Sequence, residues 1–270
     1  MEVSSRGRIV TTLALIAGLG LAGIATAEVG AEARGASSNM IRRPEVITRP
    51  GSYVVVANID ASQTGTAIRI QADDVTLDLG GYTIWGPGGR QGFGIEIAGA
   101  SNVTVRNGHL QNFGIGVVAM GATNLTVEGL QIDGEDSGGA PPDVEIGVML
   151  VESRGVRVTG STITDTFLGI FVRGESSGGN RISDNLLAAG ANGELGICYN
   201  PAPGQSSGGP DGDLVYGNVV SGFRRSVAFS TDSTNNVLRG NTLAYLDLGV
   251  DEASPGANLL VGNDEVDLAP

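Results

Sequence analysis

The sequence contains no lysine, one cysteine and one histidine, and only 4% of its 270 residues are aromatic. The single cysteine, Cys198, cannot form an intrachain disulfide, and zinc sites built from paired cysteines are excluded as well. Because aromatic side chains are so few, a core has to be built from aliphatic residues. The sequence is instead rich in glycine, with 44 residues, yet its regularly spaced aliphatic residues do not indicate disorder.

Positive charge is also scarce. All 16 basic residues are arginines, and they face 29 acidic residues, so the net charge is −13. This charge makes nucleic acid and an anionic membrane surface poor partners. It also disfavours a bare polyanionic sugar, unless Ca²⁺ bridges the sugar to the protein.

A short motif recurs along the chain. It consists of an amide, carboxylate or glycine residue, a run prone to form a β-strand, and a second turn residue, Asn or Gly in most copies, about five positions later. The clearest copies start at Asn180, Asp213, Asn236 and Asn258, and looser copies start at Asp74, Asn102, Asn124 and Gly155. Repeats with this period are typical of solenoids. In the early copies an aliphatic residue follows the second turn residue by three positions and in the late copies by two, so no single register covers both halves.

A second motif precedes most copies, a small residue followed by alternating aliphatic residues, as in Gly169-Ile170-Phe171-Val172. None of the repeats contains a run of ten or more residues at helical period. We therefore predict an all-β fold, a single-stranded parallel solenoid of about eight coils. Alternate residues would point inward to form an aliphatic core, and Asn side chains at the bends would stack into amide ladders.

The N-terminal residues resemble a secretory signal. Two arginines precede an apolar run rich in Ala, Leu and Gly, and Ala25-Thr26-Ala27 fits a cleavage site. We predict a signal peptide over 1–27, a flexible lead-in over 28–48 and the solenoid domain over 49–270. The mature protein would be secreted or periplasmic, without a membrane span.

The Asn…Gly-Asn pattern at Asn236–Asn241 carries a family resemblance. Over about 50 to 265 the sequence resembles the right-handed parallel β-helix proteins of the pectate-lyase-like superfamily, and more narrowly their NosD-like carbohydrate-binding and sugar-hydrolase repeat type. The resemblance implies a carbohydrate partner. It assigns no catalytic residue, because the absence of lysine rules out Lys-dependent lyase chemistry and neither the Gly-His-Gly nor the Asp-Pro-His-Asp motif of related enzymes is present.

An outward column of side chains follows from stacking the second motif. Its members are Arg69, Glu96, Val118, Met149, Phe171, Cys198, Ala228 and Asp251. The middle five are apolar, so either the long insertions at 133–145 and 200–212 cover them, or they line a ligand groove with Phe171 as a platform. The candidate substrate-binding residues on these strands are Met149, Phe171, Arg173 and Tyr199.

Two further candidates are polar. The acidic insertion offers carboxylates for Ca²⁺, although solvated loop acids would look the same; the candidate ligands are Asp133, Glu135, Asp136, Asp143 and Glu145. The lone His109 could act as a general base only with a carboxylate or Arg on a neighbouring coil, and is otherwise a surface or turn residue. We expect Cys198 to be a packed side chain.

Three functions remain open. The first is an exported β-helix protein that binds a polysaccharide or cell-envelope glycan without a recognisable catalytic motif. The second is a polysaccharide lyase, glycoside hydrolase or epimerase with an unrecognised site. The third is a NosD-like factor for envelope assembly or metallocentre maturation.

Overall fold

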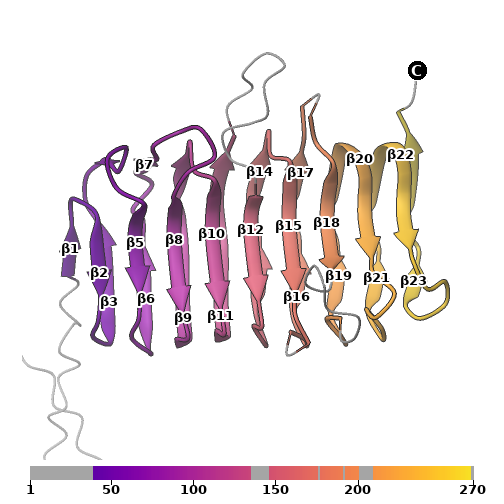
Figure 1. Cartoon of the computed structure of the whole chain (residues 1–270), viewed down its shortest axis with the longest axis horizontal. Helices are drawn as coiled ribbons and strands as arrows, with labels where there is room; N and C mark the ends of the chain where they lie inside the picture. Colours follow the sequence, from indigo (N-terminus) through magenta and orange to yellow (C-terminus); the bar gives the residue numbers. More distant parts are fainter. Residues whose placement is uncertain (1–38, 135–145, 176, 191, 201–208, 269–270) are drawn as a thin grey trace, which may run out of the picture. The chain divides into compact units, whose positions relative to one another are not determined.

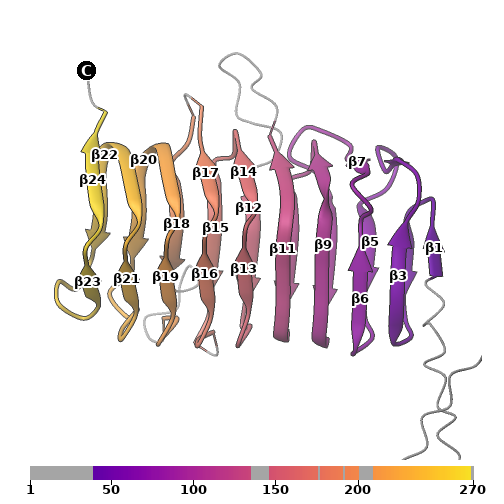
Figure 2. The same ribbon diagram turned by 180° about the vertical axis from the view of Figure 1, so that it is seen from behind.

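Parallel strands stack on one another along the whole described chain (Figures 1 and 2). The computed structural model describes residues 39–134, 146–175, 177–190, 192–200 and 209–268. These residues form 24 strands and no helix, so the described chain contains no helix that could cross a membrane. The predicted fold class, an all-β parallel solenoid of about eight coils, is confirmed.

The strands fall into three columns, which form three faces of the solenoid. The first face consists of β1 (Asn39–Ile41), β3 (Gly51–Val55), β6 (Val75–Asp78), β9 (Ser101–Gln111), β11 (Thr123–Asp133), β13 (Arg157–Thr159), β16 (Arg181–Ser183), β19 (Leu214–Tyr216), β21 (Val237–Arg239) and β23 (Leu259–Val261). All eight predicted copies of the first motif lie in this column, from β6 to β23.

The other two faces share the longest strands with their neighbours. The second face consists of β4 (Ile59–Asp60), β7 (Thr83–Trp85), the ends of β9 and β11, β14 (Thr162–Thr164), β17 (Leu186–Ala188), the starts of β20 (Val219–Phe229) and β22 (Thr242–Glu252), and β24 (Asp264–Asp267). The third face consists of β2 (Glu45–Ile47), β5 (Thr66–Ile70), β8 (Phe93–Ala98), β10 (Ile115–Met120), β12 (Ile146–Val151), β15 (Leu168–Arg173), β18 (Leu195–Asn200) and the ends of β20 and β22.

The solenoid begins earlier than predicted. Residues 39–47 were assigned to a flexible lead-in, but they form β1 and β2, which pair with β3 and β5. Ile41 and Ile47 are each 1% exposed and belong to the core cluster. This part of the lead-in prediction is wrong, because two isolated aliphatic residues were enough to cover the first coil.

One register covers both halves of the chain. Ile163 pairs with Leu187, so the corner at Gly160 is equivalent to the corner at Asp184, one residue before Asn185. The residues at this corner adopt the left-handed conformation, with φ between 56° and 65°; they are Asn107, Gly129, Gly160, Asp184, Gly217, Gly240 and Gly262. The late Asn residues therefore occupy the position after the corner. This explains why the aliphatic residue follows them by two positions, whereas it follows the early turn residues by three.

The Asn residues form two ladders inside the corners, as predicted. In one ladder, Asn218 Nδ2 donates to Asn241 Oδ1 at 3.0 Å, and Asn241 Nδ2 donates to Asn263 Oδ1 at 2.9 Å. Each of these Oδ1 atoms also accepts the backbone N–H of the preceding Asn. Asn218 and Asn241 are each 1% exposed, so the ladders satisfy backbone groups that would otherwise be buried without partners.

The second ladder contains a carboxylate where its neighbours have amides. Asp213 lies between Asn180 and Asn236 and accepts from Asn180 N and Nδ2, at 2.7 and 3.1 Å. Burial raises the pKa of the Asp213 carboxyl above its ordinary value, although the Asn180 donors oppose this shift. The folded protein therefore keeps this proton to higher pH than the unfolded chain, and stability is lost as pH rises from about 4 through the folded pKa.

We expect Asp213→Asn to stabilise the protein at pH 7 by roughly 1–2 kcal/mol, because the variant buries no charge and continues the amide ladder. Urea unfolding at pH 4 and pH 7 measures this, and the variant should lose the decline in stability between them. Asp264→Asn, at an exposed site, is the control. A variant less stable than the parent at pH 7 would show that the ionised carboxylate with its Asn180 donors is net favourable.

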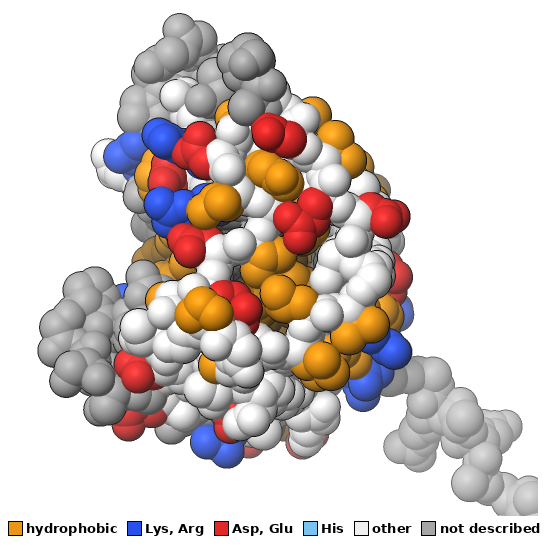
Figure 3. Space-filling model, turned by 90° about the vertical axis from the view of Figure 1, so that its right-hand side faces the viewer, with side chains coloured by type: hydrophobic (Ala, Val, Ile, Leu, Met, Phe, Trp, Pro, Cys, Tyr) orange, Lys and Arg blue, Asp and Glu red, His pale blue; other side chains and the backbone are white. Residues whose placement is uncertain are grey.

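The last described coil exposes apolar side chains. Seen from this end, Figure 3 shows hydrophobic side chains beside acidic ones. Leu259, Leu260, Val261 and Val266 are between 41% and 57% exposed. Leu260 stands in the same column as the fully buried Leu238, but within the described chain no further coil covers it.

Candidate functional site

A cluster of polar side chains lies on the second face, over its early coils. The outward positions of β7, β9, β11 and β14 form two neighbouring columns, separated by a column of inward aliphatic residues. The first column contains Thr83, His109, Gln131 and Thr162, and the second contains Trp85, Gln111, Asp133 and Thr164. Because parallel strands repeat about every 4.8 Å, side chains on adjacent coils are within reach of one another.

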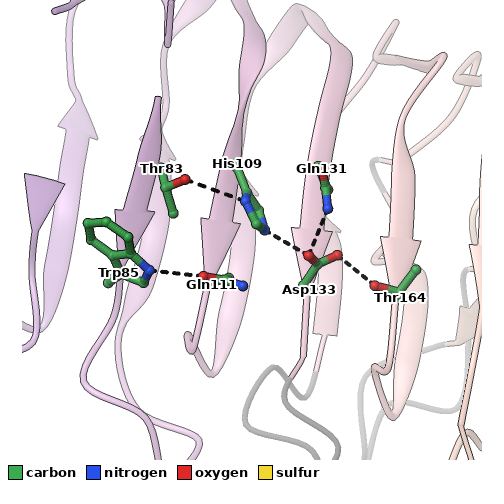
Figure 4. A network of polar contacts seen from close by, with 7 residues as sticks. All are labelled: Thr83, Trp85, His109, Gln111, Gln131, Asp133 and Thr164. Carbon is green, nitrogen blue, oxygen red and sulfur yellow. Dashed lines mark hydrogen bonds and ion pairs between the residues drawn. The ribbon is translucent and has the colours of Figure 1, made fainter. Parts of the chain in front are cut away.

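His109 and Asp133 form the centre of the cluster (Figure 4). His109 Nε2 lies 2.7 Å from Asp133 Oδ2. Asp133 Oδ2 also accepts from Gln131 Nε2 at 2.9 Å, and Thr164 Oγ1 donates to Asp133 Oδ1 at 2.6 Å. On its other side, His109 Nδ1 lies 3.5 Å from Thr83 Oγ1. Both ring nitrogens and both carboxylate oxygens therefore have partners, which fixes the orientation of the imidazole.

Trp85 provides an aromatic surface beside this cluster. The residue is 36% exposed, and its Nε1 donates to Gln111 Oε1 at 2.9 Å (Figure 4). A partly exposed ring with its one polar atom already bonded presents an apolar face of defined orientation. The second face thus places a fixed aromatic ring near fixed polar groups.

A shallow groove of about 390 Å³ runs along the corner between the first and second faces. His109, Gln131 and Thr83 line one side of it. Its floor contains Asn107, Gly129 and Gly160, the corner residues with φ near 58°. Glycine is favoured at such positions, and at Gly129 and Gly160 the absence of a side chain leaves the backbone open to a ligand.

The described part of the cluster combines one carboxylate with several neutral polar groups. Glycoside hydrolysis usually needs two carboxyl groups about 5 to 10 Å apart, and Asp133 is the one carboxylate in this network. Within the described chain, no group of three or more His, Cys, Asp or Glu side chains could hold a metal ion. The arrangement therefore offers oriented hydrogen-bond donors and acceptors and an aromatic face.

Comparisons with known proteins agree with this fold. Residues 46–200 match the family described as the right handed beta helix region. The chain belongs to this family. The right-handed parallel β-helix of the resemblance is thereby confirmed. None of the curated proteins matches this sequence.

Solved β-helix structures are similar in fold at low sequence identity. An exopolygalacturonase from Thermotoga maritima matches with a TM-score of 0.52 and 8% identity, over 84% of this chain and 69% of that one. The tailspike protein of E. coli bacteriophage HK620 in complex with a pentasaccharide matches with a TM-score of 0.50 and 14% identity, over 83% and 52%. This β-helix chain thus spans about half to two thirds of the length of those structures.

The outward column predicted on the third face is confirmed in full. Its residues pair in the expected order, from Arg69 with Glu96 through Met149 with Phe171 to Ala228 with Asp251. Val118, Phe171 and Cys198 are between 2% and 9% exposed, yet they lie outside the core cluster. Phe171 therefore presents little of its ring to solvent, and its role as a ligand platform stays a prediction, as does that of Met149.

The other two substrate-binding candidates lie at different depths. Arg173 is the last residue of β15 and is half-buried. Tyr199 is 1% exposed, belongs to the core cluster and stacks on Phe229 with ring centroids 4.9 Å apart. The alternation of β18 turns Cys198 outward and Tyr199 into the core, so Tyr199 presents almost no surface to a ligand, and its role in substrate binding stays a prediction.

Cys198 is a packed side chain, as expected. It is 4% exposed, and burial raises the pKa of its thiol to about 12. At neutral pH the thiol therefore carries its proton and is a poor nucleophile.

Of the five predicted metal ligands, only Asp133 lies among the described residues. Asp133 is the last residue of β11 and not part of a loop, and it bonds His109, Gln131 and Thr164. Glu135, Asp136, Asp143 and Glu145 lie outside the described residues, so a Ca²⁺ site stays a prediction. The contact between His109 and Asp133 was not predicted; the pairing of Leu110 with Ile132 places the two residues on adjacent coils.

Proposed function

We propose that the protein binds an oligosaccharide along the second face, in the groove lined by His109 and across the neighbouring ring of Trp85. The observation that supports it most is the fixed polar network next to a partly exposed aromatic ring. Sugars offer hydroxyl groups for such donors and acceptors and C–H faces for such a ring. Because the network is already ordered, binding would cost little additional side-chain entropy. Two proteins of similar fold, an exopolygalacturonase and a tailspike protein in complex with a pentasaccharide, are consistent with a carbohydrate ligand.

Export is part of this proposal. Residues 1–27 carry the pattern of a secretory signal, and a protein outside the cytoplasm would meet polysaccharides and cell-envelope glycans. The NosD-like role in envelope assembly has no specific side-chain arrangement in its favour among the described residues.

A glycan array followed by calorimetry on the best oligosaccharide tests the binding site. We expect Trp85→Ala to weaken binding at least about tenfold, because the ring supplies the apolar contact. His109→Ala should weaken it similarly, because it leaves Asp133 without its main partner.

Met120→Ala is the matched control, since Met120 is 39% exposed but lies on the third face. It should leave the affinity unchanged. If the glycans bind the parent, Trp85→Ala and His109→Ala with equal affinity, the ligand must bind elsewhere. If no glycan in the array binds the parent, the proposal is refuted.

Catalysis is the second candidate, and the 2.7 Å contact between His109 and Asp133 is the observation in its favour. A carboxylate that orients an imidazole is a common arrangement for general base chemistry. The oligosaccharide identified by binding can be tested for new reducing ends and for unsaturated sugars. Product formation that disappears in Asp133→Asn would favour an enzyme over a binding protein.

A further inference from the structure

Two arginines flank one tyrosine on the first face, over the later coils. Tyr216 ends β19, and the guanidinium of Arg239, on the next coil, lies 5.4 Å from the centre of its ring. The guanidinium of Arg181, on the preceding coil, lies 5.9 Å from the same centre. Strands β16, β19 and β21 lie side by side (Figure 2), so the three side chains come from three successive coils.

Among the described residues, no ion pair involves either guanidinium group. In the part of the chain that the structure describes, ion pairs occupy Arg69, Arg106, Arg224 and Arg225. Arg181 and Arg239 are exposed and belong to none of these pairs. In a protein with a net charge of −13, two unpaired arginines held against one ring form a local positive site.

A groove of about 420 Å³ lies directly beside Tyr216 and Arg239. Its floor is formed by Gly217, Gly240 and Gly262, whose φ values lie between 56° and 65°. These glycines continue the corner that forms the floor of the groove beside His109. From Asn107 to Gly217 this corner advances by four coils, or about 19 Å at the spacing of parallel strands.

We propose that Arg181, Tyr216 and Arg239 form a subsite for an acidic oligosaccharide, and that each guanidinium group binds a carboxylate or sulfate group of this ligand. Guanidinium groups bind such planar or tetrahedral oxyanions through paired hydrogen bonds, and the Tyr216 ring would contact the sugar. This inference rests on the proposed function, because it extends the same ligand along the same corner. The net charge of −13 repels a polyanionic sugar from the protein as a whole. At this subsite, however, the guanidinium groups of Arg181 and Arg239 provide positive charge.

One carboxylate on this corner provides an internal test. Asp184 adopts φ 57° at the corner one coil before Gly217, and it is exposed. Its charge should repel an anionic ligand. Asn tolerates the left-handed conformation well, so Asp184→Asn removes the charge without disturbing the corner.

Binding of three polymers to the full chain separates the possible ligands: dextran, dextran sulfate and polygalacturonate. We expect one of the two anionic polymers to bind more tightly than dextran. Arg181→Gln with Arg239→Gln should weaken that polymer at least about tenfold, and Asp184→Asn should strengthen it. The double variant Arg42→Gln with Arg43→Gln removes the same charge from exposed sites on the first coil and should have no effect.

The outcomes also distinguish this inference from the proposed function. If the Arg181 and Arg239 variant binds both anionic polymers as tightly as the parent, the acidic subsite is refuted while oligosaccharide binding beside His109 can still stand. The same conclusion follows if the control arginines matter equally, since the effect would then be one of net charge. If Trp85→Ala and His109→Ala leave the affinity of every polymer unchanged, the proposed site itself fails.

Discussion

Replacing Asn218 with alanine should lower the free energy of unfolding by about 4 kcal/mol. The Asn218 amide donates to the carbonyl groups of Ile182 and Tyr216, at 3.0 and 3.1 Å, and its Oδ1 accepts from Asn185 N and Nδ2, both at 3.0 Å. Alanine leaves these buried groups without partners, and each costs about 1–3 kcal/mol. Since proteins of this size are stable by about 5–15 kcal/mol, the loss should be visible as a large shift of the urea midpoint.

Asn263→Ala is the matched control for this prediction. Asn263 ends the same ladder, is half-buried and donates to one carbonyl group, that of Leu238. Its replacement should cost about 1 kcal/mol, because Asn263 itself is half-buried and water that enters the vacated site can bond the groups left behind. Equal losses at the two positions would show that the depth of the ladder does not determine its contribution.

Adding a single methyl group at Gly169 should also be strongly destabilising, by about 3 kcal/mol. A Cβ atom there would lie 2.4 Å from the carbonyl oxygen of Gly196 and 2.5 Å from Leu187 Cδ2. Gly147 faces the Gly169 carbonyl oxygen in the same way, at 2.6 Å. The methyl group would push strand β15 away from β18, with which it is paired, and overpacking of this kind is costly. Thermal unfolding of Gly169→Ala measures the effect.

Gly65→Ala provides the comparison. A Cβ atom at Gly65 would meet nothing within 4 Å, and Gly65 is absent from the residues with positive φ. Alanine should therefore leave the stability unchanged or raise it slightly, because it restricts the unfolded chain. If Gly169→Ala were as stable as Gly65→Ala, the coils would have to be more loosely stacked than the described contacts indicate.

The sequence predicted the stacking of the coils well but their exact register poorly at the corners. The reason lies in the chemistry of asparagine, which is suited to two neighbouring positions. At Asn107 it adopts the left-handed conformation of the corner itself, whereas at Asn185 it occupies the next position and bonds across the coils. Both uses look the same in a sequence, and only the pairing of Ile163 with Leu187 separates them.

The candidate site could be predicted only in part. His109 was identified as needing a partner from a neighbouring coil, but the contact with Asp133 depends on a diagonal between two columns. Asp133 was assigned to an acidic insertion, because a carboxylate before Gly134 and further acids looks like a loop. The strand continues to Asp133 because Ile132 fills the core beneath it, and this continuation brings the carboxylate to the imidazole.

The left-handed corner has a consequence for how such a surface can change. From Asn107 to Gly262, successive coils cross this corner with the same backbone geometry, and equivalent positions repeat about every 4.8 Å. Inserting one whole repeat between Thr164 and Arg181 would move the imidazole and the two guanidinium groups apart by one coil, while the local surroundings of each stayed the same. The length of sugar chain that could reach both would then be set by the number of intervening repeats, independently of the side chains that hold its two ends.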